Sequence, residues 1–147
     1  MNKFESVYRK YGTLIVLFFL IIIVSLINSK FLTMYNILNI FRQVSINGLI
    51  AFGMTFVILT GGIDLSVGAI LGLSGMLLGL MVVAGIPDIV AIPTVLIIGA
   101  LLGCFNGILI SKLKLQAFIV TLATMTMFSG LTMIISNGIP AMGITKN

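Results

Sequence analysis

The chain has 147 residues, of which 60% are hydrophobic and only 7% are charged, with a formal net charge of +5. Soluble domains carry about a quarter charged residues, and disordered segments combine low hydrophobicity with high charge. These numbers exclude a soluble globular domain and a disordered chain, and they predict a protein that lies in a lipid bilayer. Charged residues bound five uncharged stretches, at residues 11–29, 43–63, 65–87, 89–111 and 115–145.

Each stretch is long enough for a helix that crosses a hydrocarbon core of about 30 Å. We therefore expect one all-α domain over residues 1–147, a polytopic membrane helix bundle of about five transmembrane helices plus one short interfacial helix. So many spans leave no room for an enzyme domain. The basic residues sit singly or in pairs at span edges, without aromatic platforms, which favours membrane anchoring over nucleic-acid binding.

The first span is expected at residues 12–28, where large apolar side chains cover every face. Such a helix contacts lipid over most of its circumference. Its apolar core is long for a signal peptide and no small-residue cleavage site follows it, so we interpret it as a retained span.

Residues 30–43 predict the short interfacial helix. Thr33 is a suitable N-cap, apolar side chains then share one face, and Asn36, Asn39 and Gln43 share the other. This amphipathic pattern is typical of a helix that lies in the membrane interface. A connecting helix without any partner is the alternative.

Spans two and three are expected at residues 44–59 and 67–83, separated by a glycine-containing break. Glycines recur in span three at steps of four, three and four: Gly68, Gly72, Gly75 and Gly79. Small residues let helix backbones approach closely, and in lipid such packing drives helix association. This pattern predicts that span three is an inner helix.

Span four is expected at residues 89–110, with Pro93 in its first turn, and span five at residues 118–136. Span four repeats the small-residue pattern at Gly99, Gly103 and Gly107. We expect spans three and four to form an antiparallel pair through their glycine faces. In span five a stripe of mostly hydroxyl side chains should face protein or a polar cavity. An Asn-Gly-Ile-Pro turn follows at residues 137–140.

Lysine and arginine residues favour a cytoplasmic N-terminus. That orientation places Lys3, Arg9, Lys10, Lys112 and Lys114 on the inner side and Lys30, Arg42 and Lys146 on the outer side, and inner loops are enriched in such residues.

Asp64 is the one acidic residue beside a glycine break within the apolar region. A carboxylate in a bilayer is costly, which favours a functional role in a pathway. Asp64 or Ser66 could instead cap span three, while Gly61 and Gly62 end span two in left-handed conformations. The two interpretations are compatible, because transporters place sites at interrupted helices. We therefore single out Gly61, Gly62, Asp64 and Ser66 as candidate pathway or hinge residues.

No other chemistry is indicated. The Gly-Gly pair lacks the Gly-Lys-Ser/Thr of a phosphate loop. The chain has no histidine and one cysteine, Cys104, so we expect no catalytic residues, no metal site and no cofactor.

Four stretches carry a family resemblance: residues 58–68 (ILTGGIDLSVG), 30–39 (KFLT followed by NILN), 103–107 (GCFNG) and 118–125 (FIVTLATM). In order and spacing they resemble the monosaccharide permeases of ABC transporters, the ribose, xylose, galactose and autoinducer-2 group, which is related to branched-chain amino acid permeases. Gln116-Ala117 departs from the proline common there. The family is about twice as long, so the chain resembles its N-terminal half and lacks the helix that docks on the ATPase.

The resemblance implies a permease subunit, not an enzyme, that passes a monosaccharide such as ribose across the bacterial cytoplasmic membrane. It also implies a cytoplasmic ATPase subunit, an extracellular or periplasmic sugar-binding protein and a second permease subunit as partners. The orientation expected above makes the outer interfacial helix a candidate docking surface for the binding protein. The alternatives are a fragment of an ion-coupled secondary carrier and a non-transporting membrane scaffold. The sequence does not identify the sugar.

Overall fold

The computed structural model describes residues 3–138, with side chains from residue 11 onward. Within that range it contains five helices and no strand: α1 (Lys3–Ile27), α2 (Met34–Leu59), α3 (Val67–Val83), α4 (Asp88–Ser111) and α5 (Ala117–Ile135). The all-α expectation is confirmed. The side chains of Lys3, Arg9 and Lys10, and all of residues 139–147, including Pro140 and Lys146, lie outside the described part.

Three helices, α2, α4 and α5, are long and apolar enough to cross a membrane. The apolar part of α1 (Tyr11–Ile27) and α3 (Val67–Val83) are shorter apolar helices. At 1.5 Å per residue, their 17 residues reach about 25 Å, at the lower end of the length that a span requires. The chain is a multi-pass membrane protein. It divides into two units, residues 1–49 and 50–147, which we describe separately.

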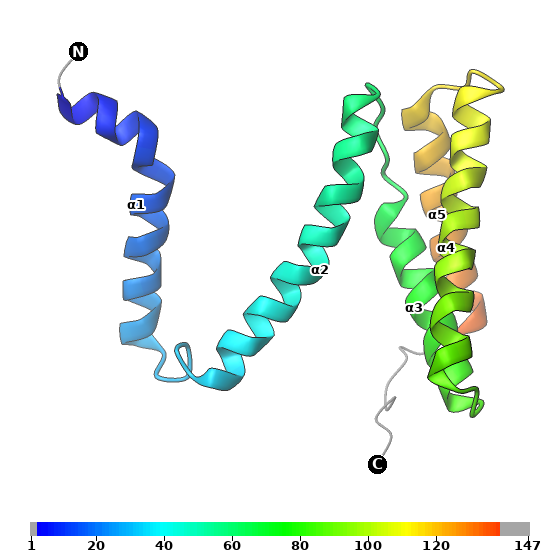
Figure 1. Cartoon of the computed structure of the whole chain (residues 1–147), viewed down its shortest axis with the longest axis horizontal. Helices are drawn as coiled ribbons and strands as arrows, with labels where there is room; N and C mark the ends of the chain where they lie inside the picture. The colour runs from blue at the N-terminus through cyan, green and yellow to red at the C-terminus, as the bar shows by residue number, and fades with distance from the viewer. Residues whose placement is uncertain (1–2, 139–147) are drawn as a thin grey trace. The chain divides into compact units, whose positions relative to one another are not determined.

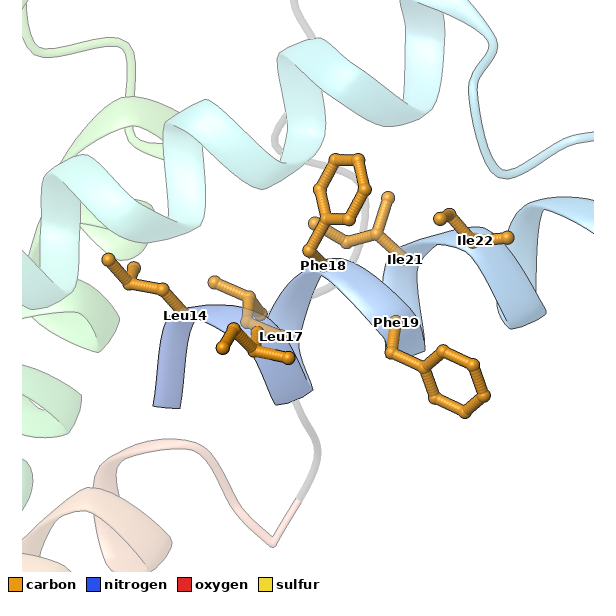
Figure 2. Close-up of a pocket in the computed structure, with 7 residues that line it drawn as sticks. Leu14, Leu17, Phe18, Phe19, Ile21 and Ile22 are labelled. Carbon is orange, nitrogen blue, oxygen red and sulfur yellow. The ribbon is translucent and has the colours of Figure 1, made fainter. Parts of the chain in front are cut away.

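In the first unit, the part of α1 between Tyr11 and Ile27 is apolar on nearly all sides. Figure 2 shows that Phe18 and Phe19 project from opposite sides of the helix, and both are more than 60% exposed. A hollow of about 530 Å³ on this helix is lined only by apolar side chains, between Leu14 and Ile22. It offers no side-chain hydrogen bond to a ligand, so we interpret it as lipid-facing surface.

The expected short interfacial helix is not a separate element. Residues 34–59 form one continuous helix, α2, so the boundary predicted between residues 43 and 44 is wrong. No proline or glycine occurs between Thr33 and Gly48, and a change from an amphipathic to an apolar pattern does not break a helix. Thr33 does cap its start: Thr33 Oγ1 accepts a hydrogen bond of 3.4 Å from the backbone N–H of Asn36.

In the second unit, α3 packs against both α4 and α5, as Figure 1 shows, in agreement with its prediction as an inner helix. Phe128 of α5 is fully buried, and Leu73, Ala91, Val95 and Val120 complete the apolar core. Pro93 is the sixth residue of α4, which begins at Asp88, and so lies in the second turn and not in the first turn as expected. Its ring removes the N–H that would bond to the carbonyl of Ile89.

Most glycines of α3 and α4 are not in close contact with other described residues. A Cβ atom would meet nothing within 4 Å at Gly68, Gly72, Gly75, Gly103 or Gly107, and at Gly99 it would lie 3.5 Å from Ser74 Oγ. Gly79 is buried. The role of these seven glycines in helix packing stays a prediction. Gly68 and Gly72 line a hollow of about 430 Å³ together with Met125, Ser129 and Thr132 of α5. These three α5 residues belong to the stripe of mostly hydroxyl side chains that we expected to face protein or a polar cavity.

Candidate functional site

The break between α2 and α3, residues 60–66, is hereafter the connector. It begins with a Schellman turn: Gly61 N–H donates to the carbonyl of Ile58 at 2.9 Å, and Gly62 N–H to that of Val57 at 3.0 Å. These bonds satisfy carbonyls that the end of a helix leaves free. The turn requires a left-handed residue, and Gly61 supplies it with φ +74°.

Gly62 has a different reason to be glycine. It is not in the left-handed region that was expected for both glycines. A Cβ atom on Gly62 would lie 3.3 Å from both Cγ1 and the carbonyl oxygen of Val57. Its backbone therefore passes too close to the last turns of α2 to accommodate a side chain easily.

Asp64 organises the second half of the connector. Its Oδ1 accepts two hydrogen bonds from Ser66, one of 2.8 Å from the backbone N–H and one of 2.6 Å from the hydroxyl. Ser66 precedes the first residue of α3 and makes no side-chain capping bond of its own. Asp64 is thus the residue that satisfies a backbone N–H at this helix start, and Ser66 is held by it.

Ser66 in turn joins this segment to α4 through a hydrogen bond. Asn106 Nδ2 donates a hydrogen bond of 2.8 Å to Ser66 Oγ, across 40 residues of sequence. Ser66 is fully buried and Asn106 is 3% exposed. Hydrogen bonds between buried polar groups are strengthened by the low local dielectric. Asp64, Ser66 and Asn106 therefore form one hydrogen-bond relay, in which Ser66 Oγ donates to Asp64 and accepts from Asn106.

A second tie joins the connector to α5. Thr121 Oγ1 lies 2.8 Å from the carbonyl oxygen of Ala117 and 3.3 Å from that of Ile63, so its single proton is shared between them. Thr121 is 1% exposed. The connector is thereby held to both of the helices that flank α3.

A hollow of about 520 Å³, the Asp64–Asn106 pocket, opens where the end of α2, the end of α4 and the start of α5 meet the connector. Its polar lining residues are Thr60, Asp64, Asn106, Ser111 and Thr121. Asn106 Oδ1 is buried and has no hydrogen-bond partner among the described residues. Such an acceptor is costly when it is left unpaired, and because this oxygen is buried it is not open to the pocket.

Of the candidate pathway residues, Gly61, Gly62 and Asp64 line this pocket, and Ser66 lies behind it as part of the relay. Gly103 and Gly107 of α4 also line it, although we predicted them only as packing residues. Asn106 and Thr121 also line the pocket and were not among the predicted site residues, although Thr121 belongs to the hydroxyl stripe that we expected to face protein or a polar cavity. An asparagine within an apolar span was the available signal, since polar groups in spans are usually functional or paired.

The pocket offers hydrogen-bonding groups and no reactive constellation. The described residues include no group of three or more His, Cys, Asp or Glu side chains that could hold a metal ion. Its chemistry is therefore suited to binding or passage of a polar molecule.

Comparisons with known proteins agree on one family. The sequence profile described as branched-chain amino acid transport system / permease component matches residues 36–144. The chain is 58% identical to the ribose import permease protein of Bacillus subtilis over 144 residues, which are 98% of the chain and 45% of the relative. It is 53% identical over 126 residues to the ribose import permease protein of Haemophilus influenzae, covering 86% of the chain and 39% of the relative.

A third relative is the D-allose transport system permease protein of Escherichia coli, 43% identical over 137 residues, with 92% of the chain and 42% of the relative covered. No solved structure matches the chain. The chain thus spans less than half the length of these relatives. Because the family profile covers most of the sequence, the chain belongs to the family of branched-chain amino acid transport system permease components.

Proposed function

We propose that the chain forms the N-terminal part of a permease subunit of a binding-protein-dependent ABC importer. In this role it passes a monosaccharide such as ribose across the bacterial cytoplasmic membrane. The observation that carries the proposal is 58% identity, over 98% of the chain, to a protein that imports ribose. The permease makes and breaks no covalent bonds, and ATP hydrolysis belongs to a separate subunit.

The proposed partners are a cytoplasmic ATPase subunit, an extracellular or periplasmic sugar-binding protein, a second permease subunit and membrane lipid. Nucleic acid is not among them. With the N-terminus in the cytoplasm, the connector and the α4–α5 loop lie at the inner face. The exposed Lys112 and Lys114 in that loop support this orientation.

The polar connector supports a role in transport more than a scaffold role. A scaffold helix bundle gains nothing from a buried relay with an unpaired acceptor, which costs stability. An ion-coupled carrier would be expected to contain several acidic or histidine side chains within its spans, whereas the sequence has no histidine, Asp64 lies between two helices and Asp88 lies at the start of another.

Uptake by a fused permease tests the proposal. The chain is joined to the remaining C-terminal part of the Bacillus subtilis ribose permease and produced with the ATPase and binding-protein subunits in cells that lack their own ribose permease. We expect labelled ribose to accumulate, and to stop accumulating with an ATPase variant that cannot hydrolyse ATP. Uptake that continues with this variant but collapses with a protonophore would support the carrier. No uptake at a normal membrane level would contradict the permease.

A further inference from the structure

The turn between α1 and α2 carries another hollow, of about 670 Å³, that lies entirely within the first unit. It differs from the apolar hollow on α1, because most of its lining residues are polar: Asn28, Lys30, Thr33, Tyr35 and Asn36. It is hereafter the Lys30 hollow. None of these side chains belongs to the polar relay of the connector, so their presence needs an explanation of its own.

Hydrogen bonds within this turn occupy acceptors and leave donors free. Asn28 Oδ1 accepts the backbone N–H of Lys30 at 2.9 Å, and the Thr33 hydroxyl donates to the carbonyl of Lys30 at 2.8 Å. Asn36 Nδ2 donates to the carbonyl of Phe31 at 2.7 Å. The same bonds fix which side of each amide group is the oxygen and which is the nitrogen.

Three donor groups of the lining have no acceptor in the described part of the chain. They are the ammonium of Lys30, the hydroxyl of Tyr35 and the amide nitrogen of Asn28. A lysine side chain offers donors and no acceptor, and an amide nitrogen does the same. A surface with this excess of donors suits a ligand that offers acceptors, and a phosphate group is such a ligand.

The charge of the first unit favours a ligand that is negative as a whole. The sequence contains no Asp or Glu between Glu5 and Asp64, so Lys30 and Arg42 are the charged side chains of residues 11–49. A zwitterionic ligand would bring a cationic group that no carboxylate of this unit can pair, whereas an anion gains from Lys30 without that cost.

The Lys30 hollow also lies at the depth of lipid head groups. The 26 residues of α2 reach about 39 Å, roughly 9 Å more than the hydrocarbon core. Polar side chains are concentrated in residues 34–43 and residues 44–59 are mostly apolar, so the excess length projects at the start of α2. Leu32, Met34 and Tyr35 are 61%, 72% and 78% exposed there. Apolar and tyrosine side chains beside a lysine are typical of a membrane interface and not of a surface that faces a soluble protein.

We propose that the Lys30 hollow binds the head group of an anionic phospholipid, such as phosphatidylglycerol. The ammonium of Lys30 and the amide nitrogen of Asn28 donate to the phosphate oxygens, and the hydroxyl of Tyr35 is a further donor. The exposed apolar side chains around the turn contact the acyl chains. This site does not depend on which substrate the permease passes, and it assigns a lipid partner to a named place on the chain.

Fluorescence quenching by brominated lipids tests the site. The chain contains no tryptophan, so a single introduced tryptophan reports its own lipid contacts. Ile27→Trp places this probe next to Asn28, at a side chain that is 80% exposed, and Ile97→Trp in α4, where the side chain is 60% exposed, is the matched control. The 147-residue chain is placed in phosphatidylcholine vesicles that contain a small fraction of brominated lipid, either phosphatidylglycerol or phosphatidylcholine.

At Ile27→Trp we expect phosphatidylglycerol to bind about fivefold more strongly than phosphatidylcholine, because a basic residue at an anionic membrane surface contributes about 1 kcal/mol. Ile97→Trp should show no preference. Adding Lys30→Gln to Ile27→Trp should abolish the preference, whereas Arg42→Gln, which removes the same charge outside the hollow, should leave most of it.

A second variant leaves Lys30 in place. Asn28→Asp keeps the oxygen that accepts from the backbone N–H of Lys30 and replaces the free amide nitrogen by a charged oxygen. It should also abolish the preference for phosphatidylglycerol. Equal helix content by circular dichroism verifies that each variant folds.

No preference at Ile27→Trp, or an equal preference at Ile97→Trp, overturns the site. Equal losses for Lys30→Gln and Arg42→Gln would mean that the overall charge of this unit attracts the lipid, which also overturns the hollow as the site. If Lys30→Gln leaves the lipid preference intact and instead weakens binding of the sugar-binding protein, the hollow is a protein-docking surface and the proposal is wrong.

Discussion

Ser66 should contribute more to stability than Asn106, which donates a hydrogen bond to it. Ser66→Ala removes a 2.6 Å bond to Asp64, and hydrogen bonds to charged groups contribute about 1.5–3 kcal/mol. It also leaves the buried Asn106 Nδ2 without its acceptor, at a cost of about 1–3 kcal/mol. We expect the free energy of unfolding to fall by roughly 3–5 kcal/mol.

Asn106→Leu should cost far less. It removes one neutral hydrogen bond, worth about 1 kcal/mol, and it also removes Asn106 Oδ1, which is buried without a partner. The two effects oppose each other, so we expect a change within about 1 kcal/mol of zero. In the double variant the orphaned amide is gone, and the loss should be about 1–3 kcal/mol smaller than the sum of the single losses.

Equilibrium unfolding by sodium dodecyl sulfate in mixed micelles, followed by far-ultraviolet circular dichroism, measures all three variants. Asn39→Leu in α2 is the matched control for the asparagine substitution, because Asn39 takes no part in the relay. Equal losses for Ser66→Ala and Asn106→Leu, or additive losses in the double variant, would refute the hydrogen-bond relay as we describe it.

Three further predictions concern the connector and the loops. Gly61→Ala should lower the free energy of unfolding by about 1–2 kcal/mol, because the φ angle of Gly61 is +74°. Its control is Gly53→Ala, inside α2 with nothing within 4 Å of an added Cβ atom, which should raise the free energy of unfolding by about 0.5–1 kcal/mol. The same unfolding titration compares the two variants, and equal effects would contradict the left-handed turn. Lys114→Gly should stabilise the chain by about 1 kcal/mol, since Lys114 has φ +54°, with Lys112→Gly as the control that should not stabilise. Asp64→Asn should reduce ribose uptake by the fused permease at a normal membrane level; wild-type uptake would leave Asp64 only its capping role.

The two local features of the connector, the helix end at Gly61 and the cap at Asp64, could be predicted from neighbouring residues in the sequence. A Gly-Gly pair after an apolar run indicates a helix end, and Gly61 adopts the left-handed conformation that such an end requires. An aspartate shortly before a helix start is a recognisable cap, and Asp64, three residues before the first residue of α3, bonds to the backbone of Ser66. These features depend on neighbours within about six residues, so periodicity and residue type are sufficient to infer them.

The tertiary part was not predictable in the same way. The bond from Asn106 to Ser66 spans 40 residues and depends on how far α4 is rotated and shifted against α3, which spacing along one helix does not determine. The glycine pattern suggested close contact between these helices, yet a Cβ atom at Gly103 would meet nothing. The continuity of α2 was missed for another reason, because a change in polarity along a sequence marks a change of surroundings and not a helix end.

Of the two interpretations of Asp64, the capping role is carried by one oxygen atom, and the pathway role stays a prediction that concerns the other. Oδ1 accepts both bonds from Ser66 and so performs the structural role. Oδ2 makes no bond to the described part of the chain, and the residue lines the pocket. An asparagine keeps an oxygen for the first role and loses one acceptor and the charge needed for the second. Asp64→Asn should therefore separate the two roles, because the helix start is retained while transport is reduced. No substitution at Ser66 can separate them, because Ser66 supports both the helix start and the position of Asp64.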